Sequence, residues 1–204
     1  MSAFTTPQSS IRRQLPVVRR RRYNRGLLGA VAFIAAESMF FSGLFLAYFF
    51  LRTDTTLTVR SDQPLHPSIA LPLINTLILT ISVAAMAWAE RSIAKDNQRN
   101  LIVGTTVAAA LGLIFMLLQS VEFSRFVTEG FTPNSSAFGS TFFALLIFHV
   151  LRVFAGVTFM LIVLVRAFMG QFSRHRRAAV QACAAYWYFI FAVWLLVLAV
   201  LYRS

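Results

Sequence analysis

The sequence predicts an all-α, polytopic integral membrane protein with five transmembrane helices. Apolar residues make up 58% of the 204 residues and charged residues only 13%, about half of the usual globular share. Apolar runs of spanning length also occur five times along the chain, since about 20 helical residues cross a ~30 Å hydrocarbon core. A soluble domain of this length could not bury so much apolar surface.

Each expected span is an apolar run bounded by polar or turn-forming residues. The runs cover approximately residues 26–51, 69–89, 101–123, 138–168 and 182–202. Pro72 falls near the start of the second run, where a first-turn proline is tolerated. The connection 52–68 holds two prolines, and the connection 124–137 holds Gly-Phe-Thr-Pro-Asn, a turn signal. We therefore expect a basic segment over 1–25 followed by a five-helix membrane domain over 26–204.

The basic residues indicate how the chain is oriented. Lysine and arginine number 19 against 7 acidic residues, a net charge of +12. Fourteen of the 19 lie in the segment 1–25, in the connection after the second span, and at the end of the fourth span and in the connection after it. These regions share one side of the membrane. Because positive charge collects on the cytoplasmic side, the N-terminus is expected to be cytoplasmic and the C-terminus outside.

The segment 1–25 has no acidic residue and is rich in arginine, serine and threonine. We favour a topology and lipid-headgroup anchor. An organellar transit peptide and a nucleic-acid-binding arm stay open as alternatives. The excess charge mainly encodes orientation and contact with anionic lipid, so we expect no nucleic-acid partner.

The cysteine and histidine content limits the chemistry of the chain. Cys183 is its one cysteine, and His66, His149 and His175 are its three histidines. A membrane core holding haem and copper needs several histidine ligands. We therefore expect no haem, copper or multi-cysteine metal site in this chain, so the chain should carry no electrons itself.

Five of the polar side chains within the expected spans stand out, because ionisable groups are costly in hydrocarbon and mark function or helix pairing. They are Glu37, Gln119, Glu122, His149 and Arg152. Approximate depths predict that Glu37 pairs with Arg152 and that Glu122 pairs with His149. We favour a structural role for these groups. Direct proton transfer by Glu37, lipid-headgroup coordination and an electrostatic effect on a neighbouring subunit remain alternatives.

Sequence motifs follow one another along all five spans, beginning with the stretch around Glu37 and with Pro72, Asn75 and Thr76. In this order they resemble subunit III of the haem-copper cytochrome oxidases. Glu37 lies in the stretch Phe-Ile-Ala-Ala-Glu-Ser-Met-Phe-Phe, and the second span has Pro72 with Asn75 and Thr76. The later spans carry matching positions: Leu111-Gly112, Phe115, Gln119, Glu122-Phe123, residues 138–143, Phe148-His149, Gly156 and residues 186–194. The resemblance covers roughly residues 26–202. Five spans, where the common long form has seven, are similar to the short bacterial form.

The chain departs from the family pattern at three positions. Arg152 stands where the fourth span usually has a second histidine, and Tyr188 and Phe191 replace a histidine and an acidic residue. These departures indicate a divergent branch. Roles known for those positions are therefore not carried over to this chain.

The resemblance implies an accessory subunit without a redox centre in a respiratory terminal oxidase that couples oxygen reduction to proton pumping. Haem and copper would reside in partner subunits, namely the catalytic subunit I and the copper-carrying subunit II. The chain would stabilise subunit I, bind phospholipid and support proton uptake or oxygen access, alone or within a larger supercomplex. The bacterial inner membrane is the expected location, ahead of the mitochondrial inner membrane.

Several residues take implied roles from the resemblance. Glu37 matches the family's carbodiimide-reactive glutamate. Gln119, Glu122 and His149 match buried polar positions near a lipid cleft, and Arg152 would contact either an anionic lipid or Glu37. Two other functions stay open: a related subunit of a nitric oxide reductase, and an independent transporter of protons or small solutes.

Overall fold

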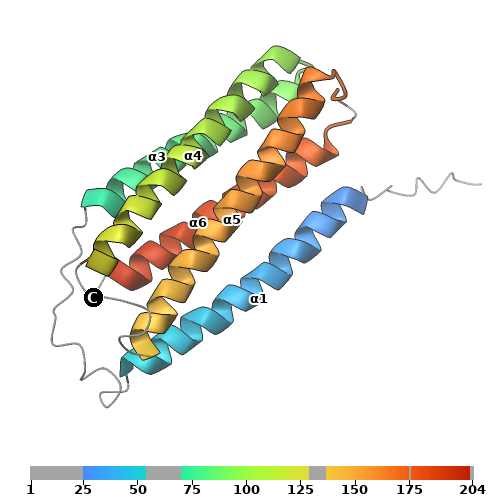
Figure 1. Ribbon diagram of the computed structural model, residues 1–204. Coiled ribbons are helices and arrows are strands. Elements are labelled where there is room, and N and C mark those ends of the chain that lie inside the picture. Colours follow the sequence, from blue (N-terminus) through green and yellow to red (C-terminus); the bar gives the residue numbers. More distant parts are fainter. Residues whose placement is uncertain (1–24, 54–69, 129–136, 175, 203–204) are drawn as a thin grey trace, which may run out of the picture.

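The computed structural model describes residues 25–53, 70–128, 137–174 and 176–202. These residues form α-helices joined by turns and contain no β-strand. The helices are α1 (Arg25–Thr53), α3 (Ala70–Ala94), α4 (Gln98–Thr128), α5 (Ala137–Phe168) and α6 (Ala178–Tyr202), arranged lengthwise beside one another (Figure 1). The segment 1–24, most of the connection 52–68, residues 129–136, His66 and His175 lie outside the described residues.

All five helices are long and apolar enough to cross a membrane. The shortest have 25 residues, which at ~1.5 Å per residue is roughly 38 Å and exceeds a ~30 Å hydrocarbon core. In the described residues the chain is therefore an all-α protein with five membrane-spanning helices. This confirms the predicted fold class.

The helices extend beyond several of the apolar runs. α3 continues past Ala89 to Ala94, and α4 begins at Gln98 and ends at Thr128. Residues 124–128, expected in a connection, are therefore helical. Backbone groups must form hydrogen bonds within the helix wherever water is scarce. The helices therefore continue into the membrane–water interface, where polar side chains are tolerated. Hydropathy marks the hydrocarbon-crossing part of a helix but not its ends.

Helices α3, α4, α5 and α6 pack together as a bundle, and α1 lies along one side of it (Figure 1). Among the described residues, α1 contacts α5 and α6 but neither α3 nor α4. Phe41 and Tyr48 are the buried hydrophobic residues of α1. Most side chains on this helix therefore face away from the bundle.

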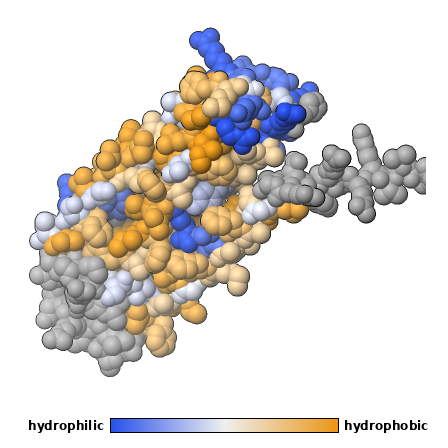
Figure 2. All heavy atoms as spheres, turned by 45° about the vertical axis from the view of Figure 1, so that its right-hand side comes forward, coloured by the Kyte–Doolittle hydropathy of each residue, from blue (hydrophilic) through white to orange (hydrophobic). Residues whose placement is uncertain are grey.

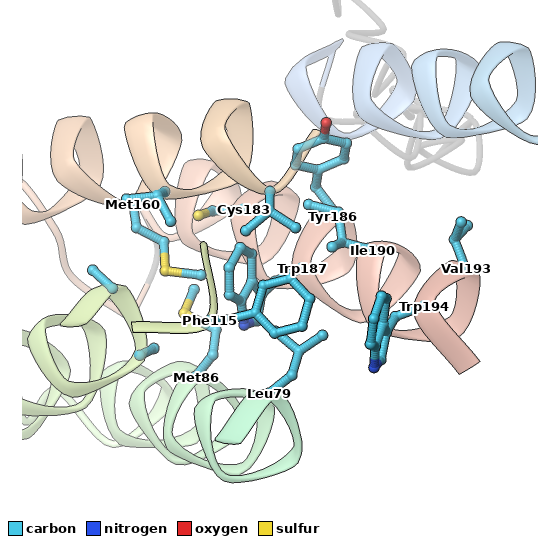
Figure 3. Packing of buried hydrophobic residues seen from close by; sticks show 14 of the residues in the cluster. Leu79, Met86, Phe115, Met160, Cys183, Tyr186, Trp187, Ile190, Val193 and Trp194 are labelled. Carbon is cyan, nitrogen blue, oxygen red and sulfur yellow. The ribbon is translucent and has the colours of Figure 1, made fainter. Parts of the chain in front are cut away.

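The centre of the bundle is built around Trp187 of α6, which is fully buried. It points toward α3 and α4, whereas its neighbour Tyr186 points toward α1 (Figure 3). Gly112 of α4 and Gly156 of α5 make room for the indole, because a Cβ added at either glycine would lie 2.8–2.9 Å from a Trp187 ring atom. The two glycines thus let three helices converge on one large ring.

The α3–α4 and α5–α6 turns interlock at one end of the bundle, which we term the turn end. Asp96, with a φ of 57°, accepts a hydrogen bond on Oδ1 from the backbone N–H of Arg174 at 2.5 Å. Gln98 Nε2 donates to the backbone oxygen of Ala167 at 2.5 Å. These contacts join one helical hairpin to the other.

The sides of the molecule are broadly apolar, and hydrophilic residues gather at one end (Figure 2). Large hydrophobic side chains are exposed on every helix, including Met39, Leu46, Leu117 and Phe168 at 67–77% exposure. Such surface is stable against lipid tails or another membrane protein rather than water.

Candidate functional site

The first candidate site joins α1 to α5. Arg152 Nε and Glu37 Oε2 form an ion pair, and the two side chains are only 13% and 18% exposed. The structure therefore brings together the two residues that the depth argument places opposite each other. Each charge neutralises the other inside a segment where an unpaired charge would be costly.

Aromatic rings surround the arginine of this pair. The guanidinium carbon of Arg152 lies 4.7 Å from the ring centroid of Phe40 and 4.4 Å from that of Phe41, both within the range of a cation–π interaction. Phe40 also meets Phe148 of α5 edge to face, with centroids 4.9 Å apart. The arginine is thus held by one carboxylate and two ring faces, all from α1.

A second polar site links α3 to α4. Asn75 Nδ2 donates to Gln119 Oε1 at 3.3 Å, and Gln119 Nε2 donates to Glu122 Oε2 at 2.9 Å. All three side chains are buried. Gln119 therefore connects the other two side chains: its carboxamide oxygen accepts from Asn75 and its carboxamide nitrogen donates to Glu122.

His149 does not pair with Glu122, so this predicted pairing is wrong. Neither ring nitrogen of His149 has a hydrogen-bond partner in the described part of the chain. Its ring instead lies against Trp194, with centroids 5.2 Å apart, and meets Phe115 edge to face at 6.0 Å.

The register of α4 against α5 explains this. The ring contacts Phe123–Phe143 and Phe115–His149 fix how the two antiparallel helices slide past each other. They place Phe123, the neighbour of Glu122, beside Phe143, which lies six residues and therefore more than one helical turn before His149. The depth of a residue in the membrane, when estimated from the ends of an apolar run, is too imprecise to distinguish one helical turn from the next.

Two tryptophans on α6 form polar contacts that the sequence reasoning missed. Trp194 Nε1 donates to Thr76 Oγ1 at 2.9 Å, and Trp187 Nε1 donates to Ser82 Oγ at 3.1 Å. The sequence of α3 did contain an indication of these contacts. Asn75, Ser82 and the buried apolar residues of α3 recur at helical spacing along one face of the helix. That spacing could have placed both polar residues toward the bundle.

Tyr188, one of the departures from the family pattern, has a partner near the turn end. Its hydroxyl donates to Glu90 Oε2 at 3.0 Å. The bond joins α6 to α3 and gives the Glu90 carboxylate a donor from the bundle. Nothing in the sequence motifs paired these two residues.

A groove of about 350 Å³ opens between α4 and α5 beside the second polar site. Its wall is made by Gln119, Ser120, Phe123, Ser124, Leu146, Ile147 and Val150. Gln119 therefore faces the groove while its carboxamide holds Asn75 and Glu122. In the described ranges, no group of three or more His, Cys, Asp or Glu side chains is arranged to hold a metal ion.

Comparison with known proteins gives one consistent match. The family model described as cytochrome c oxidase subunit III matches residues 20–204. Cytochrome c oxidase subunit 3 of Locusta migratoria is 37% identical over 173 residues, covering 82% of this chain and 64% of that protein. The Equus caballus protein is 32% identical over 179 residues, covering 85% and 67%, and the Pan troglodytes protein 34% over 193 residues, covering 92% and 70%. The chain thus spans about two thirds of the length of these relatives.

Proposed function

The chain belongs to the cytochrome c oxidase subunit III family, and from this premise we propose that it is an accessory subunit of a respiratory haem-copper oxidase. The observation that carries this proposal is the family match over residues 20–204. The assembled complex would reduce oxygen to water and couple the reaction to proton pumping. This chain would contribute membrane structure and no redox centre.

Haem and copper would be bound by partner subunits, the catalytic subunit I and the copper-carrying subunit II. The exposed apolar side chains on the helices support membrane-embedded contact with such partners and with phospholipid. The charge distribution of the sequence supports a cytoplasmic N-terminus, and the location that we propose for the complex is a bacterial inner membrane.

The polar sites would stabilise the subunit within that complex. The ion pair with Arg152 supports a structural role for Glu37, because a carboxylate held by a permanent cation joins α1 to α5. A carboxyl group that carries protons would have to leave that pair on each turnover. Support of proton uptake or oxygen access by the subunit would then arise from holding subunit I and its lipids in place.

A Glu37→Gln variant tests that role of Glu37. The expected result is a normal initial rate of proton uptake with a shorter lifetime during turnover, because the amide weakens the contact between helices without removing a proton carrier. Stopped-flow proton uptake and prolonged oxygen-consumption assays would measure the two quantities. A slower initial uptake would identify Glu37 as a proton-transfer group instead.

Purification of the tagged chain in mild detergent tests the function itself. Haem absorbance should elute with the chain, and the eluted complex should consume oxygen. Membranes carrying the untagged chain provide the control for nonspecific retention. A haem complex that consumes nitric oxide and not oxygen would favour a nitric oxide reductase. A lone chain without haem that binds a solute would overturn the proposal.

A further inference from the structure

One layer of the α3–α6 bundle holds polar atoms that its own side chains do not satisfy. His149 is 1% exposed and Asn75 is completely buried. Both ring nitrogens of His149 and the amide oxygen Oδ1 of Asn75 have no hydrogen-bond partner among the residues that the structure describes. Such groups are rare in folded proteins, because burial removes their bonds to water and nothing repays the loss.

Printed contacts place the two side chains in the same layer. His149 lies against Trp194 and Phe115, and those two rings meet edge to face with centroids 5.0 Å apart. Trp194 donates to Thr76, the residue that follows Asn75. Asn75 in turn donates to Gln119, one helical turn from Phe115. The contacts connect His149 to Asn75 through all four helices of the bundle.

The nearest polar side chains are already engaged. The hydroxyl of Thr76 donates to the backbone oxygen of Pro72 at 2.7 Å and accepts from Trp194. The carboxamide of Gln119 accepts from Asn75 and donates to Glu122. What the layer needs is therefore a group that can donate to an amide oxygen and also bond an imidazole nitrogen.

The groove between α4 and α5 lies beside this layer. Gln119, which holds Asn75, forms part of its wall, as does Leu146, one helical turn before His149. The groove volume of about 350 Å³ exceeds the ~30 Å³ that one molecule occupies in liquid water. Ser120 and Ser124 add two hydroxyls to the wall.

We infer that this layer binds internal water, with His149 and Asn75 as its protein ligands and the α4–α5 groove as its entrance. Water is the smallest molecule that both donates and accepts hydrogen bonds, and buried water typically bonds polar groups that would otherwise be unsatisfied. The inference depends on the bundle alone. It stands or falls independently of the enzyme to which the chain is assigned.

A cryo-EM map at a resolution that shows water, recorded on the chain in the assembly from which it is purified, tests the inference directly. Density is expected within hydrogen-bonding distance of Asn75 Oδ1 and of a ring nitrogen of His149. If both groups bond only to protein atoms, or face space without density, the inference is wrong. Haem in the same map would report on the proposed function separately.

A thermal double-mutant cycle gives a second test. His149→Phe and Asn75→Leu each remove one ligand of the water, so the loss of Tm in the double variant should be smaller than the sum of the single losses. Phe154→Leu, a change at an exposed position of α5, is the matched control and should combine additively with Asn75→Leu. Additive losses in the first cycle would contradict a shared water site.

Discussion

At the scale of single residues, the environment of Arg152 differs from that of an ordinary ion pair. The guanidinium contacts Glu37 and also two phenylalanine ring faces. Because the rings exclude water, the arginine depends on the carboxylate for its charge balance. Removing either partner leaves the other charge buried without a counter-ion. This destabilises a protein more than replacing both partners with apolar residues does.

We therefore predict that Arg152→Met and Glu37→Gln each destabilise the subunit by about 3 kcal/mol, and that the double variant loses less than the sum. Chemical or thermal unfolding of the purified assembly would measure the coupling. Arg125→Met, which changes an exposed arginine of α4, serves as control and should have little effect. Additivity would show that the pair contributes no interaction energy.

Gln119 is the residue on which the second polar site depends. Gln119→Leu would take away the acceptor of Asn75 and a donor to Glu122. We expect a loss of about 2–4 kcal/mol, since each deprived buried group costs about 1–3 kcal/mol. The measurement is the Tm of the assembly. Ser120→Ala, at the exposed neighbouring position, should leave Tm nearly unchanged, and equal effects would argue against the connector role.

The sequence identified the polar residues of the site better than it identified their partners. Glu37 and Arg152 could be paired because both are strong charges near mid-span, where few alternatives exist. His149 could not be placed, because its neighbours are aromatic rings whose contact depends on the register of α4 against α5. Hydropathy locates the ends of a span only to within a few residues. Predicting a hydrogen-bond partner requires the register of two helices to within one helical turn.

At the scale of helices, small residues proved informative only in context. Gly104 lets α3 and α4 approach closely, since a Cβ there would lie 2.8 Å from Ala89 Cβ, whereas Gly29 and Gly43 of α1 have open space around them. Similar small residues thus occur at a tight crossing and on an exposed helix. The spacing of small residues does not distinguish the two cases. It shows which residues share one face of a helix but not whether another helix packs against that face.

This difference predicts opposite outcomes for glycine-to-alanine changes. Gly112→Ala would place its Cβ 2.9 Å from a Trp187 ring carbon and from a Val157 methyl, so we expect a loss of about 1–3 kcal/mol from overpacking. Gly43→Ala on α1 meets no atom within 4 Å and should stabilise the helix slightly, by up to ~1 kcal/mol, because alanine has the higher helix propensity. Thermal unfolding of both variants is the measurement. A destabilising effect at both positions would point to helix flexibility instead of packing.

At the scale of the whole molecule, the charge distribution predicts which end faces the cytoplasm. Lys95→Cys, at the turn end, should react with a membrane-impermeant maleimide only after the membrane is opened. Thr128→Cys, near the opposite end of α4, should react in intact cells. Both positions are exposed, and the buried native Cys183 keeps the unmodified chain silent as a control. The reverse labelling pattern would invert the topology.

The placement of α1 also has a consequence for biogenesis. Its contacts in the described chain are with α5 and α6, and Arg152 is synthesised 115 residues after Glu37. At ~5–20 residues per second, the ribosome needs roughly 6–23 s to deliver that partner. Helix α1 is therefore synthesised before both of the helices that it contacts, and it is among the last of the described helices to reach its final place. Until then the nascent chain holds a carboxylate in the bilayer without its arginine, which is energetically costly.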